Sequence, residues 1–320
     1  MAFSTDPTTI PAAFAATAAA RPDHEAVVDG DRRVTYRELA DLVTESTSAF
    51  MAAGVGPGDR VAVWATNSLG WIVAALGARA AIVPVNTRWK GGEAAYVLAA
   101  AKVKVLCTSV GFLDTDTVAM LADDPTELPD LDHIVLLDGS GVSSASTPTT
   151  AWADWLTAGG SVSETDAHAR RDGVSPDDIS DVLFTSGTTG TPKGVLMTHG
   201  QTVRAFRDWG RQVGVRDDDR YLIVNPFFHM FGYKAGWVAS FVRGVTVYPM
   251  AVFDPDEVLE IVQRERITVF PGAPTLYRSI LDHPGLDDAD ISSLRLAVTG
   301  AADIPVSLIE EIRERLPFES

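Results

Sequence analysis

The sequence predicts an α/β protein with mostly parallel strands. Short runs of apolar and β-branched residues alternate with segments of helical periodicity along most of the 320 residues. Hydrophobic residues make up 46% of the chain and charged ones 22%, an ordinary globular composition that excludes a disordered or fibrous protein. The sequence shows no repeat at the periods typical of solenoids, so the alternation indicates layered sheets and helices.

The first half of the chain contains four clear strand candidates, Asp59–Thr66, Ile82–Asn86, Val103–Thr108 and His133–Asp138. Helical patterns over Leu69–Ala81 and Glu93–Ala101 separate the first three, as in β–α–β units. The stretch Gly139–Thr150 is rich in Ser, Thr and Gly, and we expect a loop without chemistry there.

The second half repeats this rhythm. Strands are expected at Tyr221–Val224, Val245–Tyr248, Thr268–Phe270 and Leu294–Val298, and helices at Asp256–Arg266, Pro274–His283 and Pro305–Leu316. The chain ends at Ser320, just after a predicted helix and where another strand is due. We therefore expect this end to cut through a domain.

Charge and cysteine content limit the classes of binding partner and the cellular compartment that we expect. Lys and Arg number 26 and Asp and Glu 43, and a net charge of −17 argues against general nucleic-acid binding while still permitting a local nucleotide site. Cys107 is the only cysteine, so no internal disulfide forms, a cytoplasmic location is favoured, and the thiol is expected to be a small buried hydrophobe. The longest apolar stretch, Gly70–Val85, is too short and interrupted to span a bilayer.

The strongest functional signal lies in Asp181–Gly200. Two apolar strands, Val182–Phe184 and Val195–Met197, flank the loop sequence TSGTTGTPKG, which ends in Lys193 and Gly194. Glycines let backbone N–H groups face an anion, hydroxyl groups add donors, and the lysine supplies a mobile positive charge. A polar surface hairpin is the bland alternative. An ordinary P-loop is excluded, because Pro192 precedes the lysine, glycine follows it, and the next element is a strand.

The segment FTSGTTGTPKG resembles, position for position, the phosphate-binding signature of the adenylate-forming (AMP-binding) superfamily, which includes acyl-CoA synthetases, luciferases and peptide-synthetase adenylation domains. The resemblance extends over essentially the whole chain, including TYRELADLV (35–43), GVGPGDRVAVWATNS (54–68) and AAIVPVNTR (80–88). Within the superfamily, NPFFHMFGYKAG looks most like actinobacterial fatty-acyl-CoA synthetases, including the ligase that acts on an indanedione propionate from sterol ring breakdown.

The resemblance implies an amino-terminal AMP-binding domain with two helix-flanked, mostly parallel sheets. Residues 58 to about 211 would form one, and residues 1–57 with about 215–320 the other, with ATP in the cleft between them. It also implies an acyl-CoA ligase, in which a carboxylic acid attacks the α-phosphate of ATP to give acyl-AMP and pyrophosphate, and coenzyme A then displaces AMP. ATP, Mg²⁺ and coenzyme A are the expected co-substrates and cofactor, and an exposed strand edge in the second sheet leaves a homo-oligomer open.

The nucleotide site follows from the same resemblance. The residues implied in phosphate binding are Ser186, Gly187, Thr188, Thr189, Gly190 and Lys193. Thr185 is expected to reach the α-phosphate or its Mg²⁺, which makes it the metal-ligand candidate. Those implied in packing on adenine are Gly300, Ala301 and Ala302, and the following Asp303 stands where many relatives have proline. The residues assigned to the reaction itself are Thr185, Lys193 and His229.

The acyl pocket is expected from the segment 225–234. The substrate-binding candidates are Phe228, His229, Met230, Phe231, Tyr233 and Lys234. A core position is the alternative for Phe228, Met230 and Phe231 and the preferred assignment for Phe227. His229 is expected beside the substrate carboxylate, without a general-base role, because a carboxylate is already ionised at neutral pH. For Lys234, snorkelling to solvent is the default. The competing hypothesis is that Lys234 selects an oxygenated or ring-bearing acid.

A Tyr-Gly-x-Thr-Glu segment, the next motif that the resemblance leads us to expect, does not occur in the 320 residues. The downstream aspartate that would hold the ribose, the hinge and the carboxy-terminal domain with its catalytic lysine are not recognised either. We therefore expect the ATP- and acyl-binding portion of a ligase, with little or no adenylation activity alone. The alternative is a natural non-catalytic nucleotide- or acyl-binding protein derived from such a ligase.

Overall fold

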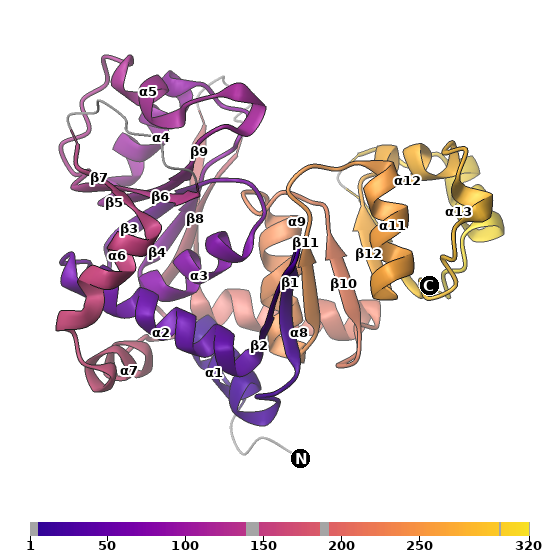
Figure 1. Cartoon of the computed structure of the whole chain (residues 1–320), viewed down its shortest axis with the longest axis horizontal. Coiled ribbons are helices and arrows are strands. Elements are labelled where there is room, and N and C mark those ends of the chain that lie inside the picture. Colours follow the sequence, from indigo (N-terminus) through magenta and orange to yellow (C-terminus); the bar gives the residue numbers. More distant parts are fainter. Residues whose placement is uncertain (1–5, 139–146, 186–191, 301, 320) are drawn as a thin grey trace.

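The computed structural model describes residues 6–138, 147–185, 192–300 and 302–319, which form two mostly parallel sheets flanked by helices (Figure 1). The predicted fold class is confirmed. The six-stranded sheet has the spatial order β13 (Leu296–Thr299), β12 (Val269–Gly272), β10 (Arg220–Ile223), β11 (Thr246–Pro249), β1 (Glu25–Asp29) and β2 (Arg32–Thr35). Its strands pair in parallel except β1 with β2, which form an antiparallel pair.

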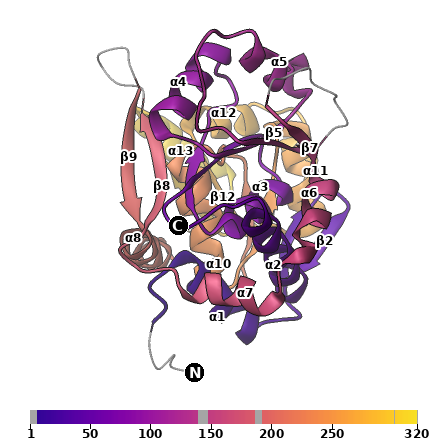
Figure 2. The same ribbon diagram turned by 90° about the vertical axis from the view of Figure 1, so that its left-hand side faces the viewer.

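The seven-stranded sheet comes from the middle of the chain. Its spatial order is β7 (Thr149–Ala151), β6 (His133–Asp138), β5 (Val105–Ser109), β3 (Arg60–Trp64), β4 (Ala81–Pro84), β8 (Ile179–Thr185) and β9 (Lys193–Thr198). The pairs are parallel except the β8–β9 hairpin, which forms one edge of the sheet (Figure 2). This hairpin was predicted from the apolar runs that flank the Ser/Thr/Gly-rich loop.

Helices separate and cover the two sheets. Those between or beside the sheets are α1 (Ile10–Ala20), α2 (Tyr36–Ala52), α3 (Leu69–Ala78), α6 (Trp152–Ala158), α7 (Glu164–Asp172), α8 (His199–Val213), α9 (Met230–Gly232), the π-helical turn η3 (Tyr233–Val238) and α10 (Ala239–Arg243). The outer faces carry α4 (Gly91–Ala101) and α5 (Thr117–Ala122) on the seven-stranded sheet, and α11 (Pro255–Glu265), α12 (Pro274–Leu281) and α13 (Val306–Arg315) on the other (Figure 1). Short 3₁₀ turns lie at η1 (Phe112–Asp114), η2 (Gly159–Ser161) and η4 (Leu286–Asp288).

The core follows the alternation of side chains along β3. Val61 and Val63 face α3 and the six-stranded sheet, whereas Ala62 and Trp64 face α4 on the other side. Both faces of this strand are buried, which explains its continuous apolar sequence. The inner cluster contains residues of both sheets, among them Tyr221 and Ile223 of β10, so one apolar core joins the two halves.

Predicted strands agree with the observed ones to within three residues at each end, and the largest difference is the start of β8 at Ile179, where Val182 was predicted. The predicted helix Leu69–Ala81 is too long, because Arg79 adopts a left-handed conformation with φ of 48° that ends α3 at Ala78. The predicted loop Gly139–Thr150 is wrong at its end, where Thr149 begins β7 and pairs with β6. β7 has only three residues, two threonines and an alanine, so the sequence shows no recognisable strand pattern there. Its strand conformation depends on pairing with β6. Most of that loop lies outside the described residues.

Cys107 lies fully buried in β5, as predicted, and burial raises the pKa of its thiol. Among the described helices, none is both long and apolar enough to cross a membrane.

Candidate functional site

A cavity of about 260 Å³ lies where strands of both sheets end. Residues that directly follow β3, β4, β10, β11 and β12 line it, including Thr66, Arg88, Asn225, Phe228, Val252 and Ala273. In open α/β sheets, ligands bind outside the carboxyl ends of the strands, because the connecting loops diverge there and expose backbone and side-chain groups. This cavity is therefore the place in the described structure where a site is expected.

Asn67 joins the two sheets at this cavity. Its amide nitrogen donates hydrogen bonds to the carbonyl oxygens of Ile223 (3.2 Å) and Asn225 (3.0 Å), and its amide oxygen accepts one from the Phe227 N–H (2.7 Å). Asn225 in turn donates to the Pro271 carbonyl at 3.0 Å. Both asparagine side chains are buried, so these bonds fix the relative position of the strand ends that form the cavity floor.

The aromatic segment after β10 divides into core and cavity residues. Phe227 is fully buried against Trp71, with ring centroids 5.5 Å apart, which confirms its core assignment. Phe228 lines the cavity, whereas Met230 has 47% of its surface exposed and Phe231 is half-buried. The substrate-binding roles of these last three residues stay predictions.

His229 occupies the N-cap of α9. Its Nδ1 accepts a hydrogen bond of 3.3 Å from the Phe231 N–H, so this nitrogen carries no proton in that geometry. Partial desolvation lowers the pKa of the imidazole. A neutral ring with an unprotonated Nδ1 carries its proton on Nε2, from which it can donate a hydrogen bond to a carboxylate, and the role beside the substrate carboxylate stays a prediction.

Lys234 is fully buried, so the snorkelling expected by default is wrong. Its Nζ lies 2.8 Å from Oδ1 of Asp181 on β8 and 3.2 Å from the Thr202 hydroxyl oxygen of α8. The preceding Tyr233 is also buried, and both belong to the π-helical turn η3, a type of distortion often found at functional sites. Neither residue lines the cavity beside Phe228, and their contact with substrate stays a prediction.

The Lys234–Asp181 contact is a buried ion pair between η3 and the hairpin strand β8. Both side chains are completely inaccessible, and the Ser180 hydroxyl donates a 2.6 Å hydrogen bond to the other carboxylate oxygen. Burial raises the pKa of Asp181 and lowers the pKa of Lys234, while the attraction between the two charges opposes both shifts. The pair therefore anchors the strand that leads into the predicted phosphate loop.

Thr185 and Lys193 lie opposite each other at the loop end of the β8–β9 hairpin. The strand register pairs them directly, and both are exposed. The predicted phosphate-binding residues 186–190 lie outside the described residues. At Gly194, a Cβ atom would come within 2.9 Å of Val182 on the paired strand, which gives a packing reason for glycine after the lysine.

The predicted adenine-binding segment follows β13. A Cβ atom at Gly300 would meet no atom of the described structure within 4 Å, and Ala302 is exposed, while Ala301 lies outside the described residues. β13 is the parallel neighbour of β12, after which Ala273 lines the cavity. The residues predicted to bind the nucleotide and those predicted to bind the acyl group thus follow the carboxyl ends of strands.

Sequence reasoning missed Asn67 and Asp181. Each had a weak local signal: an asparagine directly after a buried strand, and an acidic residue at the start of an apolar one. Neither signal specifies a partner, because Asn67 lies more than 150 positions from its partners in the chain, and Asp181 lies more than 50 positions from Lys234.

Two helix-flanked, mostly parallel sheets whose strands end at a common cavity, with an edge hairpin whose loop sequence is rich in Ser, Thr and Gly and ends in a lysine, are the features expected of the adenylate-forming class. The AMP-binding enzyme family matches residues 14–319, and the chain belongs to that family.

Two curated relatives carry the same name, 3-[(3aS,4S,7aS)-7a-methyl-1,5-dioxo-octahydro-1H-inden-4-yl]propanoyl:CoA ligase. The one from Rhodococcus jostii is 45% identical over 317 residues, which cover 98% of this chain and 61% of that protein. The one from Mycobacterium tuberculosis is 44% identical over 314 residues, covering 97% of this chain and 60% of that protein. The chain thus spans about three fifths of the length of these relatives.

Solved structures support the fold. The anthranilate CoA ligase AuaEII in complex with anthranoyl-AMP superposes with a TM-score of 0.85 at 24% identity, covering 98% of this chain and 59% of that one. The N-terminal domain of FACL13 from Mycobacterium tuberculosis gives a TM-score of 0.81 at 25% identity, covering 96% and 73% of the two chains.

Proposed function

We propose that this protein is an ATP-dependent acyl-CoA ligase, which converts a carboxylic acid, ATP and coenzyme A into acyl-CoA, AMP and pyrophosphate through an acyl-AMP intermediate. The observation that carries the proposal is the β8–β9 hairpin, which holds Thr185 and Lys193 opposite each other at the ends of a loop sequence suited to phosphate binding. Family membership and the two ligases of 45% and 44% identity support it. Because ATP and coenzyme A are intracellular metabolites, we place the reaction in the cytoplasm.

In this proposal the hairpin binds and orients the triphosphate. Lys193 attracts the β- and γ-phosphate oxygens, and the backbone N–H groups of residues 186–190 donate to them. Phosphoryl-group chemistry depends mainly on positioning and charge stabilisation, so these contacts supply most of what the chain contributes. The neutral imidazole of His229 orients the substrate carboxylate, and Gly300, Ala301 and Ala302 offer a small-residue surface to the adenine.

Mg²⁺ fits this arrangement as a companion of ATP. No cluster of three or more His, Cys, Asp or Glu side chains in the described ranges could form a protein cage for it. Mg²⁺ bound with nucleotide needs few protein ligands, because phosphate oxygens and waters complete its octahedron. The Thr185 hydroxyl at the exposed end of β8 is the candidate protein ligand. When bound, the ion would neutralise phosphate charge as a Lewis acid.

We further propose a compact, ring-bearing carboxylic acid as the substrate, of the kind that the name of the Rhodococcus relative describes. The cavity of about 260 Å³ lies just below the usual range of small-molecule sites, roughly 300–1,000 Å³, which favours a compact acid over a long alkyl chain. Phe228, Val252 and Leu276 supply apolar lining, and Thr66, Thr87 and Arg88 supply polar groups for oxygen substituents.

Binding of ATP tests the hairpin assignment on the chain itself. Titration calorimetry should show ATP binding by the wild-type chain and a dissociation constant at least about tenfold higher for Lys193→Met, as expected for loss of one charged phosphate contact of about 1.5–3 kcal/mol. Lys104→Met is the matched control, since Lys104 pairs with Asp59 at the amino end of the same sheet. Equal ATP affinity of wild type and Lys193→Met would remove the hairpin from the site.

The reaction and the substrate need a second assay on the full-length ligase. We expect pyrophosphate exchange into ATP that depends on the indanedione propionate and is at least about tenfold slower with hexadecanoate, which corresponds to about 1.4 kcal/mol in transition-state binding. Exchange that is equal with the two acids would reject the ring-acid proposal and keep the ligase. Exchange with neither acid, in a protein that binds ATP, would reject both.

A further inference from the structure

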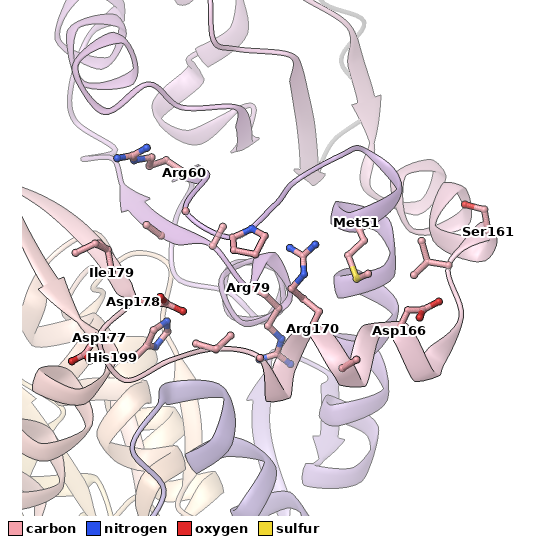
Figure 3. A pocket seen from close by; sticks show the side chains of 18 residues that line it. Met51, Arg60, Arg79, Ser161, Asp166, Arg170, Asp177, Asp178, Ile179 and His199 are labelled. Carbon is pink, nitrogen blue, oxygen red and sulfur yellow. The ribbon is translucent and has the colours of Figure 1, made fainter.

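A second and larger cavity, of about 790 Å³, lies at the opposite end of the seven-stranded sheet (Figure 3). Its lining includes the first residues of β3, β4 and β8, namely Arg60, Ala81 and Ile179, whereas the candidate active site lies beyond the last residues of the strands. The remaining walls come mainly from α7, from the segment between α7 and β8, and from Arg79 and Ala80 after α3. No part of the proposed ligase reaction uses this cavity, although its volume suits a small molecule.

Arg79 is an uncompensated charge in this cavity's wall. It is 9% exposed, and its Nε and Nη1 atoms are buried without a hydrogen-bond partner in the described parts of the chain. A buried cation without a partner is costly, and here burial lowers the pKa of Arg79 to about 9. Arg79 also holds a left-handed backbone conformation, so the fold places this side chain inward despite strain and desolvation.

Two further arginines line the same cavity. Arg170 donates one hydrogen bond, from Nη1 to the Val55 carbonyl at 3.0 Å, and Arg60 makes no side-chain hydrogen bond within the described structure. Within the ranges that the structure describes, none of the three guanidinium groups lies within 4.0 Å of a carboxylate oxygen. Three arginines without ion pairs therefore line one cavity of a chain whose net charge is −17.

The acidic residues of this cavity lie towards its ends. Figure 3 shows Asp177 and Asp178 at one end and Asp166 at the other, with Arg79 and Arg170 between them. All three aspartates are exposed, and two already accept local hydrogen bonds, Asp166 from the Ser163 hydroxyl (2.6 Å) and Asp178 from the Ser175 N–H (2.8 Å). These two hydrogen bonds are local, and none of the three aspartates forms an ion pair with Arg79 or Arg170 in the described structure.

We propose that this cavity binds a small organic anion, whose carboxylate or phosphate group pairs with Arg170 beside the buried charge of Arg79, while its apolar part packs against residues such as Met51, Val174 and Ile179. Guanidinium groups suit either headgroup, because both accept two parallel hydrogen bonds. A water in the adjoining cavity of about 20 Å³, which Arg79 also lines, is not an equivalent partner. It satisfies a donor without neutralising the charge.

Titration calorimetry with simple probes tests the proposal on the purified protein. Hexanoate and hexyl phosphate carry the two headgroups, inorganic phosphate lacks the apolar part, and hexan-1-ol lacks the charge. We expect hexanoate or hexyl phosphate to bind, inorganic phosphate to bind at least about tenfold more weakly than hexyl phosphate, and hexan-1-ol not to bind. The stronger of the first two identifies the headgroup.

Variants separate this cavity from the candidate active site. Lys193→Met should keep the probe affinity, whereas Arg79→Met and Arg170→Gln should each weaken it at least about tenfold, since Arg170→Gln removes the charged contact and Arg79→Met removes a neighbouring positive charge. Arg243→Met is the matched control, because Arg243 is a partly buried arginine outside the cavity. Arg170→Gln also covers the case in which Arg79→Met does not fold. The proposal would be overturned if Lys193→Met lost probe binding or if Arg170→Gln bound the probes as wild type does. It would also be overturned if neither hexanoate nor hexyl phosphate bound.

Discussion

Replacement of Lys234 by methionine is the sharpest test of the buried ion pair beneath the hairpin. Methionine keeps most of the side-chain volume and apolar stem, so the main loss is the positive charge 2.8 Å from Asp181. The carboxylate would then be buried with the Ser180 hydroxyl as its remaining close donor in the described structure. We expect a large loss of stability and a weakened anchor for β8.

The magnitude has two independent estimates. Removing one partner of a buried ion pair typically costs about 3–5 kcal/mol, because an uncompensated charge remains. The protein can limit this cost by protonating Asp181, and holding a carboxyl of unfolded pKa about 3.9 protonated at about pH 7.5 costs about 5 kcal/mol at 1.36 kcal/mol per pH unit. The two estimates agree on about 3–5 kcal/mol near neutral pH.

The pH dependence of the variant gives a second signature. Without Lys234, burial raises the folded-state pKa of Asp181 above its unfolded value, so the protonated folded state gains relative stability as pH falls. The difference in unfolding free energy between wild type and Lys234→Met should therefore decrease as pH falls from about 7.5 to about 5, by up to about 1.4 kcal/mol for each pH unit. Equilibrium urea unfolding at several pH values measures it.

Two further variants control this experiment. Lys104→Met removes a partly exposed lysine that lies 3.2 Å from Asp59, and it should cost no more than about 1 kcal/mol. The double variant Lys234→Met with Asp181→Asn leaves neither charge of this pair buried, so it should recover at least about 1–2 kcal/mol of the loss. A Lys234→Met protein as stable as Lys104→Met at neutral pH, or a double variant less stable than Lys234→Met, would refute the reasoning.

Three other predictions follow from the described contacts. Asn67→Ala should lower the free energy of unfolding by about 2–4 kcal/mol, because buried backbone groups lose their hydrogen-bond partner. Asn86→Ala is the control and should cost less than about 1 kcal/mol, since the hydrogen bond of Asn86 is exposed. Equal losses of the two variants in urea unfolding would contradict this prediction. Hydrogen bonds from Arg33 lower the pKa of Glu265 from about 4.5 to about 2. The stability advantage of wild type over Glu265→Gln should therefore be complete at neutral pH and disappear as pH falls from about 4.5 to about 2. A difference in unfolding free energy between the two proteins that does not depend on pH would contradict this prediction. Cys107 should react with a thiol reagent at least about 100-fold more slowly in native than in urea-unfolded protein, and comparable rates would show that β5 opens readily.

The strands and most helices could be predicted because their signals are local. β3 and β5 are short apolar runs bounded by turns, and α11 shows its buried face directly as Val258, Leu259 and Val262. β7 could not be predicted, since its strand character comes from pairing with β6. The end of α3 depended on the left-handed conformation of one arginine, for which the sequence offers no glycine as a marker.

The candidate site divides in the same way. The loop between Phe184 and Lys193 is recognisable from residue types alone, because a strand followed by glycines, hydroxyl residues and a lysine is suited to bind phosphate. The fate of Lys234 was not recognisable. A lysine in an aromatic segment is expected to reach solvent, and only the packing of η3 against β8 shows that it meets Asp181 instead.

The sequence by itself thus determined the α/β class, most strand positions, the antiparallel hairpin and the phosphate-type loop, since each depends on the order of neighbouring residues. Only the tertiary structure decided which strand ends converge, that Asn67 joins the sheets, and that Lys234 and Asp181 form a buried pair. It alone placed Arg79, Arg60 and Arg170 around one cavity. The physical reason is that burial and charge pairing depend on distance in space, which the chain order of these residues does not contain.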